Sequence, residues 1–377
     1  MMRRFGSLCV MILLAMVLSA CPGLASESIT VGAIFSLSGI AATHNGPLIP
    51  MLELAVEEVN EGGGLHGRPV KLVFLDNQST PIGSVKAAEE AVRLGMTAVI
   101  GAHWSSHSLA MAPVLQKAGI PMISPGSTHP MVTRVGDYIF RTCFVDSFQG
   151  RAMARFAFKE LGARRVAVAK NIDEDYSAML ADCFSESFQL YGGKVACEVQ
   201  YRGKAVDFSD IMEQIKRARP DVVYVPGYTR DSGLLIRQGV SMGIRVTFLG
   251  GDAWDEISVY AGDAVEGSYQ SAPWHPSVPG AESLRLKELY FRKYGAEIKS
   301  FSAPLAYDAV MLLVDAIRRA GTSDRARIRD CLAGTLDFRG ATGLINYHGG
   351  GDPIDKEIVM LKWEKGSPRY YQTIKPE

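Results

Sequence analysis

Neither sign of charge is in excess in this sequence. Its 377 residues include 40 Lys or Arg and 40 Asp or Glu side chains, so the formal net charge is zero at pH 7. No tract of basic residues is present either, whereas proteins that bind nucleic acid commonly gather Lys and Arg into a patch. We therefore expect no nucleic-acid partner.

Motifs of catalysis are also scarce. Nothing in the sequence sets a base beside a nucleophile, so we expect no enzyme. The glycine-rich run at residues 62–67 ends a predicted helix, whereas a dinucleotide-binding turn follows a strand and opens a helix. We therefore expect no bound nucleotide and no other cofactor.

Cysteine is rare, with six in the whole chain. Those beyond the N-terminal segment show neither a C-x-x-C pair nor a zinc-site spacing, and the histidines also lack metal-ligand spacing. We expect no obligatory metal. Free or buried thiols are favoured, although an exported protein could form a Cys183–Cys197 disulfide. The four cysteines concerned are Cys143, Cys183, Cys197 and Cys331.

Long apolar runs are confined to the N-terminus. Arg3 and Arg4 precede an apolar core at residues 8–18 that is too short for a stable membrane span. Residues 1–25 are therefore predicted to be a signal peptide. Leu-Ser-Ala-Cys21 resembles the lipobox of bacterial lipoproteins, which is cut before a lipidated cysteine; a cut after Ala25 is the alternative. We expect a monomer in the periplasm or on the cell-envelope exterior, touching the membrane only through a lipid on Cys21.

Apolar runs alternate with helical periodicity through the first 147 residues. This βα rhythm is typical of a parallel, doubly wound sheet. The expected strands are 29–35, 70–75, 98–100 and 120–123, with a further extended piece at 138–143. The expected helices are 48–59, 82–95 and 109–118.

The same rhythm restarts at Asp146-Ser147, which we expect to cap a helix at 148–161. A chain of this length suits two domains. Late segments 281–294, 304–320 and 324–333 read as helices with no strand between them, so we expect them to return to the first lobe. The remaining expected strands are 165–170, 194–200, 221–225, 246–249, 345–347, 358–363 and 369–374, and the remaining expected helices are 177–190, 209–218 and 231–242.

The predicted fold class is therefore α/β, with two doubly wound parallel-sheet, Rossmann-like lobes. The first lobe is predicted to comprise residues 28–147 plus 275–345, and the second lobe residues 148–274 plus 346–377. Several crossings between the lobes would form a hinge. Arg141 is expected to anchor this hinge rather than to contact a ligand.

Polar side chains follow the parallel strands of both predicted lobes, and ligands of open α/β sheets bind beyond those carboxyl ends. Hydroxyl groups and a helix start follow the first-lobe strands, which suits a carboxylate. An acid and aromatic rings follow the second-lobe strands, which suits an ammonium group. The first set is Ser105, Ser106, Ser127 and Thr128, and the second is Tyr176, Tyr228, Asp252 and Trp254.

Three stretches carry a resemblance that extends over nearly all of the predicted mature chain. They are Val31-Gly-Ala-x-x-Ser-Leu-Ser-Gly39, Gly119-Ile-Pro-x-Ile-Ser-Pro-x-Ser-Thr-x-Pro130 and Gly250-Gly-Asp-Ala-Trp254. The chain resembles the type I periplasmic binding proteins of branched-chain amino acid ABC transporters, the Leu/Ile/Val-binding family. The resemblance implies an extracytoplasmic amino-acid receptor that closes on its ligand and docks an ABC permease and its ATPase.

The resemblance also implies residue roles. Ser105 and Thr128 would bind the α-carboxylate of the ligand. The backbone carbonyl of Ser127 would share the ammonium with Asp252, which stands where leucine binders tend to have Glu. The remaining roles fall on Tyr176 and Tyr228, which would close over the ligand, and on the bulky residues His44, Trp104 and Trp254 in the wall.

The side-chain preference stays open between aliphatic or branched-chain and bulkier apolar or aromatic amino acids. One alternative is a stand-alone sensory or regulatory module of the same fold, and another is a binder of an amide, urea or small organic acid. A sensor would usually continue into a signalling segment, whereas this sequence stops soon after its last predicted strand, which favours transport.

Overall fold

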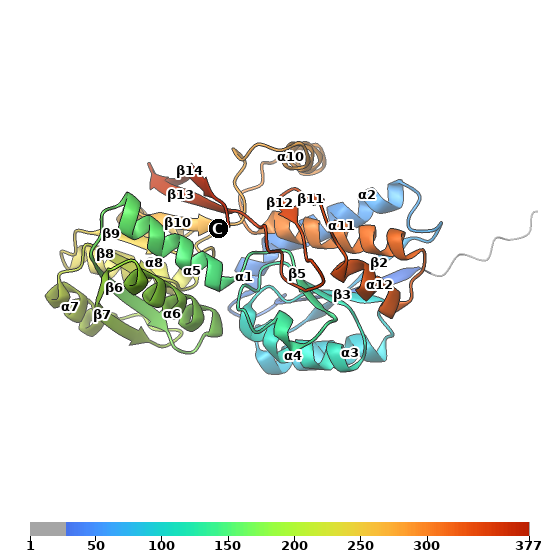
Figure 1. Ribbon diagram of the computed structural model, residues 1–377, viewed down its shortest axis with the longest axis horizontal. Helices are drawn as coiled ribbons and strands as arrows, with labels where there is room; N and C mark the ends of the chain where they lie inside the picture. The colour runs from blue at the N-terminus through green and yellow to red at the C-terminus, as the bar shows by residue number, and fades with distance from the viewer. Residues whose placement is uncertain (1–27, 377) are drawn as a thin grey trace, which may run out of the picture.

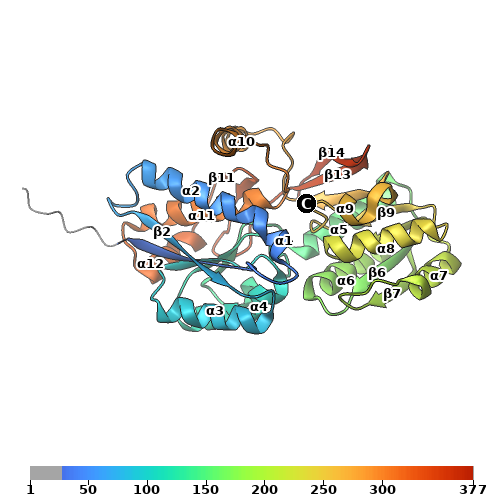
Figure 2. The same cartoon turned by 180° about the vertical axis from the view of Figure 1, so that it is seen from behind.

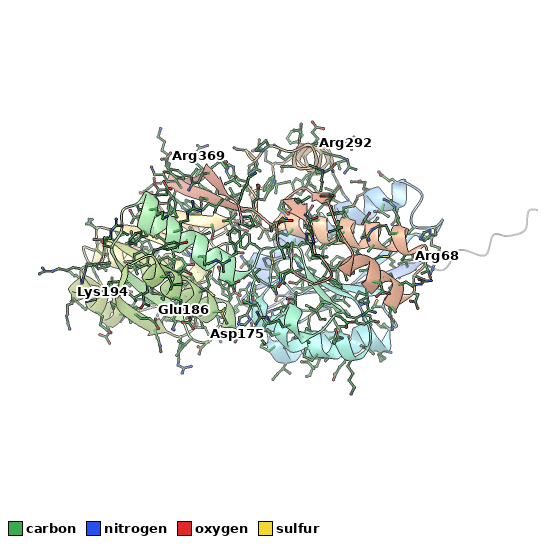
Figure 3. The ribbon with its side chains drawn as sticks, viewed as in Figure 1. Arg68, Asp175, Glu186, Lys194, Arg292 and Arg369 are labelled. Carbon is green, nitrogen blue, oxygen red and sulfur yellow. The ribbon has the colours of Figure 1, made fainter. Side chains whose placement is uncertain are left out.

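The computed structural model describes residues 28–376 and shows two α/β lobes side by side (Figure 1). The predicted signal peptide, with Cys21, lies outside the described residues. Exposed charges such as Lys194 and Arg369 lie on the outer surface, and Asp175 lies where the second lobe faces the first (Figure 3). The predicted two-lobed, doubly wound α/β fold is confirmed.

The first lobe is built on a parallel sheet in the order β2-β1-β3-β4-β5. Helices cover both faces, with α2 and α11 on one and α3 and α4 on the other (Figure 2). Its strands are β1 (Ile29–Phe35), β2 (Val70–Asp76), β3 (Ala98–Gly101), β4 (Met122–Ser124) and β5 (Ile139–Arg141). Its helices are α1 (Ala42–Asn45), α2 (Ile49–Glu61), α3 (Pro81–Arg93), α4 (Ser105–Lys117), α10 (Ala281–Tyr294), α11 (Ala303–Ala320) and α12 (Arg325–Ala333).

The second lobe is built on a sheet in the order β14-β13-β10-β9-β8-β6-β7. Strands β10 to β7 in this order are parallel, and β13 and β14 add an antiparallel edge. Its strands are β6 (Arg165–Asn171), β7 (Lys194–Tyr201), β8 (Val222–Val225), β9 (Thr247–Gly250), β10 (Tyr269–Ala272), β13 (Ile358–Glu364) and β14 (Ser367–Ile374). Its helices are α5 (Asp146–Arg155), α6 (Asp175–Leu190), α7 (Ser209–Ala218), α8 (Thr229–Ser241) and α9 (Ser258–Ala261).

The sequence explains why these elements form. Every residue of β3 and of β8 is buried, as expected for central strands covered by helices on both faces. Thr80 caps α3, because its side chain accepts a hydrogen bond from the backbone N–H of Gly83. Gly321 ends α11 with a φ of +67°, in the left-handed region that glycine tolerates best.

The start of α5 differs from the expectation that Asp146 and Ser147 cap this helix. Val145 occupies the N-cap of α5 without a side-chain hydrogen bond, and Asp146 is the first helical residue. The start of α4 is similar, because Trp104 is its N-cap and no side chain among the described residues caps it. The Ser105 hydroxyl instead accepts from the distant backbone N–H of His129, and the Asp146 carboxyl accepts from Gln149 of its own helix.

Two strands escaped prediction, whereas the favoured expectation of free thiols is confirmed. Strand β10 mixes Tyr, Gln, Ser and Ala, so it lacks a clear apolar run. Strand β11 (Phe338–Gly340) is a short partner of β12 (Gly343–Ile345) in a separate hairpin. Cys183 and Cys197 are both free, which decides against the bridge between them.

The chain passes between the two sheets after β5, after β10 and after β12, within residues 28–376. These crossings form the hinge. Helices α10, α11 and α12 contribute to the hydrophobic core of the first sheet, as expected for the late helices. In the part of the chain that is described, no helix has the length and apolar character needed to span a membrane.

Candidate functional site

A small cavity lies between the lobes, at the carboxyl ends of the parallel strands. Both lobes contribute to its wall. Trp104 of the first lobe and Tyr228 of the second stack with ring centroids 3.8 Å apart, so the two lobes are in contact across the cleft. The lining residues are His44, His103, Trp104, Ser105, Gly126, Tyr176, Tyr228, Asp252, Ala253 and Ser302.

Ser105 brings a hydroxyl and a helix N-terminus to the cavity. It is the first residue of α4, directly beyond β3, and its Oγ accepts a hydrogen bond from the backbone N–H of His129 at 3.3 Å. That bond fixes the hydroxyl oxygen and leaves the hydroxyl proton as a donor. The first backbone N–H groups of a helix have no intrahelical acceptor and favour an anion.

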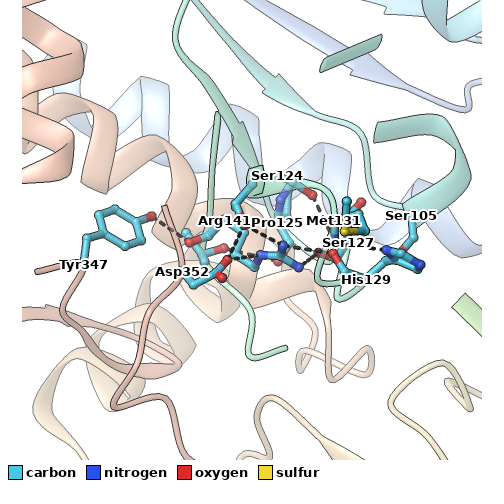
Figure 4. Close-up of polar contacts among 11 residues, drawn as sticks. Ser105, Ser124, Pro125, Ser127, His129, Met131, Arg141, Tyr347 and Asp352 are labelled. Carbon is cyan, nitrogen blue, oxygen red and sulfur yellow. Dashed lines mark hydrogen bonds and ion pairs between the residues drawn. The ribbon is translucent and has the colours of Figure 1, made fainter. Parts of the chain in front are cut away.

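Ser127 is held in the framework behind the cavity (Figure 4). Its backbone carbonyl accepts a 2.5 Å hydrogen bond from Nη1 of Arg141, which is fully buried. Its hydroxyl donates to the backbone carbonyls of Ala102 and His103. The cavity is lined at this turn by Gly126 instead. The structure therefore does not bring the Ser127 carbonyl to the cavity.

Arg141 is the anchor of this framework. Nη2 donates to the carbonyl of His129 at 3.0 Å and to the hydroxyl of Thr133 at 3.1 Å, and Nε pairs with Asp352 at 2.7 Å (Figure 4). Asp352 lies on the chain segment that returns to β13. Arg141 thus connects the first-lobe wall to the hinge, as expected from the sequence.

Thr128 is fully buried one residue beyond Ser127 and outside the cavity lining. Its backbone carbonyl accepts a hydrogen bond from the N–H of Asp146 at 2.9 Å. Its hydroxyl faces the carboxyl group of Asp146 and acts to lower the pKa of that acid, against the larger effect of burial. The residue therefore joins the first-lobe wall to the start of α5.

Asp252 supplies the buried acid of the second-lobe wall. Its Oδ1 accepts hydrogen bonds from the Tyr176 hydroxyl at 2.9 Å and from Nε2 of Gln149 at 3.1 Å. Oε1 of Gln149 in turn accepts from the Asp252 backbone N–H at 3.0 Å. Burial raises the pKa of Asp252 to about 6, so the carboxylate is ionised at neutral pH.

A second buried acid stands behind Asp252. Asp146 accepts a hydrogen bond from Gln149 Nε2 at 3.2 Å, so Gln149 links the two acids. Burial and the negative charge of Asp252 raise the pKa of Asp146 well above its ordinary value. Asp146 is not part of the cavity lining. The cavity therefore presents one carboxylate, that of Asp252, and the second acid, Asp146, lies behind it with a raised pKa.

Imidazole and aromatic rings form the rest of the wall. The indole N–H of Trp104 donates to Nδ1 of His44 at 3.0 Å, and the His44 and His103 ring centroids lie 5.1 Å apart. Burial lowers the pKa of both histidines, so both are neutral at pH 7. A Cβ on Gly126 would clash with the His103 ring, so glycine makes room for that ring.

Trp254 does not line the cavity. It is fully buried in the core of the second lobe, where its ring covers Gly250. The residues missed by sequence analysis include His103, Gly126 and Ser302 in the lining and Gln149 behind it. His103 could have been found, because it lies between β3 and Trp104 on a loop already assigned to the site.

The described residues give little support for a metal site or for a hydrolase active site. No group of three or more His, Cys, Asp or Glu side chains within residues 28–376 is arranged to hold a metal ion. The letters of residues 239–243 match a G-x-S-x-G motif, but Ser241 is the last residue of α8 and not on a strand-to-helix turn.

Comparisons with known proteins agree with this fold. A family model described as "Periplasmic binding protein" matches residues 28–368. Leu/Ile/Val-binding protein homolog 1 of Brucella abortus is 31% identical over 358 residues, which cover 93% of this chain and 95% of that protein.

Solved structures are similar as well. The leucine binding protein LivK from Thermotoga maritima matches with a TM-score of 0.86 and 33% identity, covering 92% of this chain and 99% of that one. The branched-chain amino acid transporter substrate binding protein LivJ from Streptococcus pneumoniae, in complex with isoleucine, matches with a TM-score of 0.86 and 29% identity, covering 93% and 100%. The chain belongs to the periplasmic binding protein family, in its branched-chain amino acid (Leu/Ile/Val-binding) branch.

Proposed function

We propose that this protein is the solute-binding component of an ABC importer and binds an α-amino acid between its two lobes. The observation that carries this proposal is the pairing of a helix N-terminus at Ser105 with a buried carboxylate at Asp252 in the wall of one cavity. A zwitterion matches these two ends, and the relatives named for leucine, isoleucine and valine support the same class.

The ligand carboxylate would lie at the first-lobe wall. The Ser105 hydroxyl donates to it, and the unpaired N–H groups at the start of α4 add further donors. A helix N-terminus favours an anion without a full positive counter-charge. The turn at Gly126 lies close enough to bring backbone groups to the same ligand.

The ligand ammonium would pair with Asp252. Tyr176 and Gln149 hold that carboxylate in place by hydrogen bonds to Oδ1. Tyr228 of the second lobe stacks on Trp104 of the first, so these two rings would close the cavity over the ligand. Because one ligand end is held by each lobe, binding favours the closed form, which is the form that a permease would recognise.

We propose that the protein acts outside the cytoplasm, carried there by an N-terminal signal peptide that is cut before Cys21, and held at the membrane by a lipid on Cys21. The family match supports an extracytoplasmic location. Mass spectrometry of the native N-terminus tests the anchor, with a lipidated Cys21 expected. A mature chain that begins at Ser26 would contradict it.

A thermal-shift screen of the twenty common amino acids tests the proposed function. We expect at least one of them to raise the melting temperature in a saturable way, because a ligand that binds only the folded state stabilises it by mass action. A flat response to all twenty, together with a clear shift from urea, a simple amide or an organic acid, would contradict an amino-acid ligand.

A further inference from the structure

Two buried ring nitrogens in the cavity wall have no partner within residues 28–376. They are Nε2 of His44 and Nδ1 of His103, and both residues line the cavity. A polar atom that is buried without a hydrogen bond destabilises the folded state. A ligand that satisfied these two nitrogens would be favoured over an apolar ligand of equal size.

The proton on His44 is placed by its neighbour. Trp104 Nε1 is a donor and cannot accept, so Nδ1 of His44, at 3.0 Å, is the acceptor of that bond. A neutral imidazole that accepts at Nδ1 carries its proton on Nε2. His44 therefore presents an unpaired N–H donor, which requires an acceptor on the ligand.

His103 supplies a complementary atom. Its ring lies 5.1 Å from that of His44, between centroids, and its Nδ1–Cε1 edge packs against Gly126, which lines the cavity. Neutral His103 can carry its proton on either nitrogen, so Nδ1 can accept a hydrogen bond when the proton is on Nε2. The pair then offers one donor and one acceptor to the same end of the ligand.

Other features of the wall favour a planar, uncharged terminal group. Trp104, Tyr176 and Tyr228 present flat faces, and Tyr228 lies 5.3 Å from Tyr176 between ring centroids. The acidic group of the lining, Asp252, is committed to the ligand ammonium under the proposed function. Neutral imidazoles offer no full positive charge to balance a side-chain carboxylate.

We propose that the preferred ligand is an amino acid whose side chain ends in a carboxamide, its carbonyl accepting from His44 Nε2–H and its amide N–H donating to His103 Nδ1. This inference rests on the proposed function, which fixes the two charged ends of the ligand. Asparagine is the sharpest probe because its side chain has nearly the shape of leucine. An aliphatic side chain of that shape leaves both nitrogens unpaired.

Calorimetric titration of the purified protein with L-asparagine, L-glutamine and L-leucine tests the inference. We expect one of the two amides to bind at least tenfold more tightly than leucine. In His103→Leu that preference should shrink at least tenfold, with leucine binding unchanged or tighter. The same substitution at the exposed His66, outside the cavity, is the matched control and should keep the wild-type ratio.

Leucine binding as tightly as both amides in the wild-type protein would overturn the inference and leave the proposed function standing. Binding of none of the twenty common amino acids would overturn both. The ratio of amide affinity to leucine affinity in the wild-type protein tests the inference even if His103→Leu fails to fold.

Discussion

The two walls of the cavity hold their ligand-binding groups in different ways. The first-lobe wall at Ser105 and Gly126 relies on backbone groups and one hydroxyl, set in a frame that the buried Arg141 holds together. The second-lobe wall relies on side chains, with Asp252 fixed by Tyr176 and Gln149. The first wall therefore derives its chemistry from the fold, and the second from individual residues that a single substitution can change.

Removing Arg141 should have the largest effect of any single change. We expect Arg141→Met to lower the free energy of unfolding by about 2–6 kcal/mol, because it leaves the buried carbonyls of Ser127 and His129 without donors, at about 1–3 kcal/mol each. It also removes the ion pair with the half-buried Asp352. Urea denaturation measures this. Arg93→Met is the control, since the exposed Arg93–Glu90 pair should contribute less than about 1 kcal/mol. Equal stability of the two variants would show that the hydrogen bonds of Arg141 do not hold the first-lobe wall in place.

Asp252→Asn should weaken amino-acid binding by about 2–5 kcal/mol, because it leaves the ligand ammonium buried without a counter-charge. Asp146→Asn is the matched control. Asp146 lies outside the cavity lining and its pKa is raised by burial and by Asp252. The Asp146→Asn protein should therefore bind the amino acid within about threefold of wild type, a change of less than about 1 kcal/mol. Calorimetry on both variants separates the two acids; comparable losses would assign them the same role.

Ser105→Ala should weaken binding less than Asp252→Asn does. It removes one hydrogen bond to a charged group, about 1.5–3 kcal/mol, while the backbone N–H groups of α4 stay in place. Calorimetry again gives the affinity. A loss as large as that of Asp252→Asn would mean that the first wall also depends on a single side chain.

Acidification should produce the smallest effect. The pKa of Asp252 is about 6 in the closed, ligand-free protein, so affinity for the ammonium should fall as pH drops below 6, about tenfold between pH 7 and pH 5. Asp252→Asn should abolish that dependence. Because the native pKa lies above the ordinary value of 3.8, this group makes the ligand-free protein less stable as pH rises from about 4 to about 6. Affinity that does not change with pH would contradict the ionised role of Asp252.

Strand ends could be predicted from sequence because they follow from short apolar runs. This reasoning placed Ser105, Tyr176, Tyr228 and Asp252 near one cavity, where the structure brings them together with His44 and Trp104. It could not decide which residue of a turn faces inward. Only the packing of the folded protein shows that Gly126 lines the cavity, whereas the carbonyl of Ser127 accepts a hydrogen bond from Arg141.

Contacts between residues far apart in the sequence could not be predicted either. Gln149 reaches Asp252 across 103 positions, and Trp254 turns away from the cleft into the core of its own lobe. Neither arrangement leaves a local pattern in the sequence. The lobe boundaries at 28–147 plus 275–345 and 148–274 plus 346–377 stay a prediction, as do the individual ligand contacts.

The most direct test of the central claim, that one amino acid spans both walls, is a titration with blocked ligands. The best-binding amino acid is compared by calorimetry with its methyl ester, which lacks the carboxylate, and with its N-acetyl derivative, which lacks the ammonium. We predict that each block weakens binding at least a hundredfold. Binding of either derivative as tightly as the parent amino acid would contradict the account.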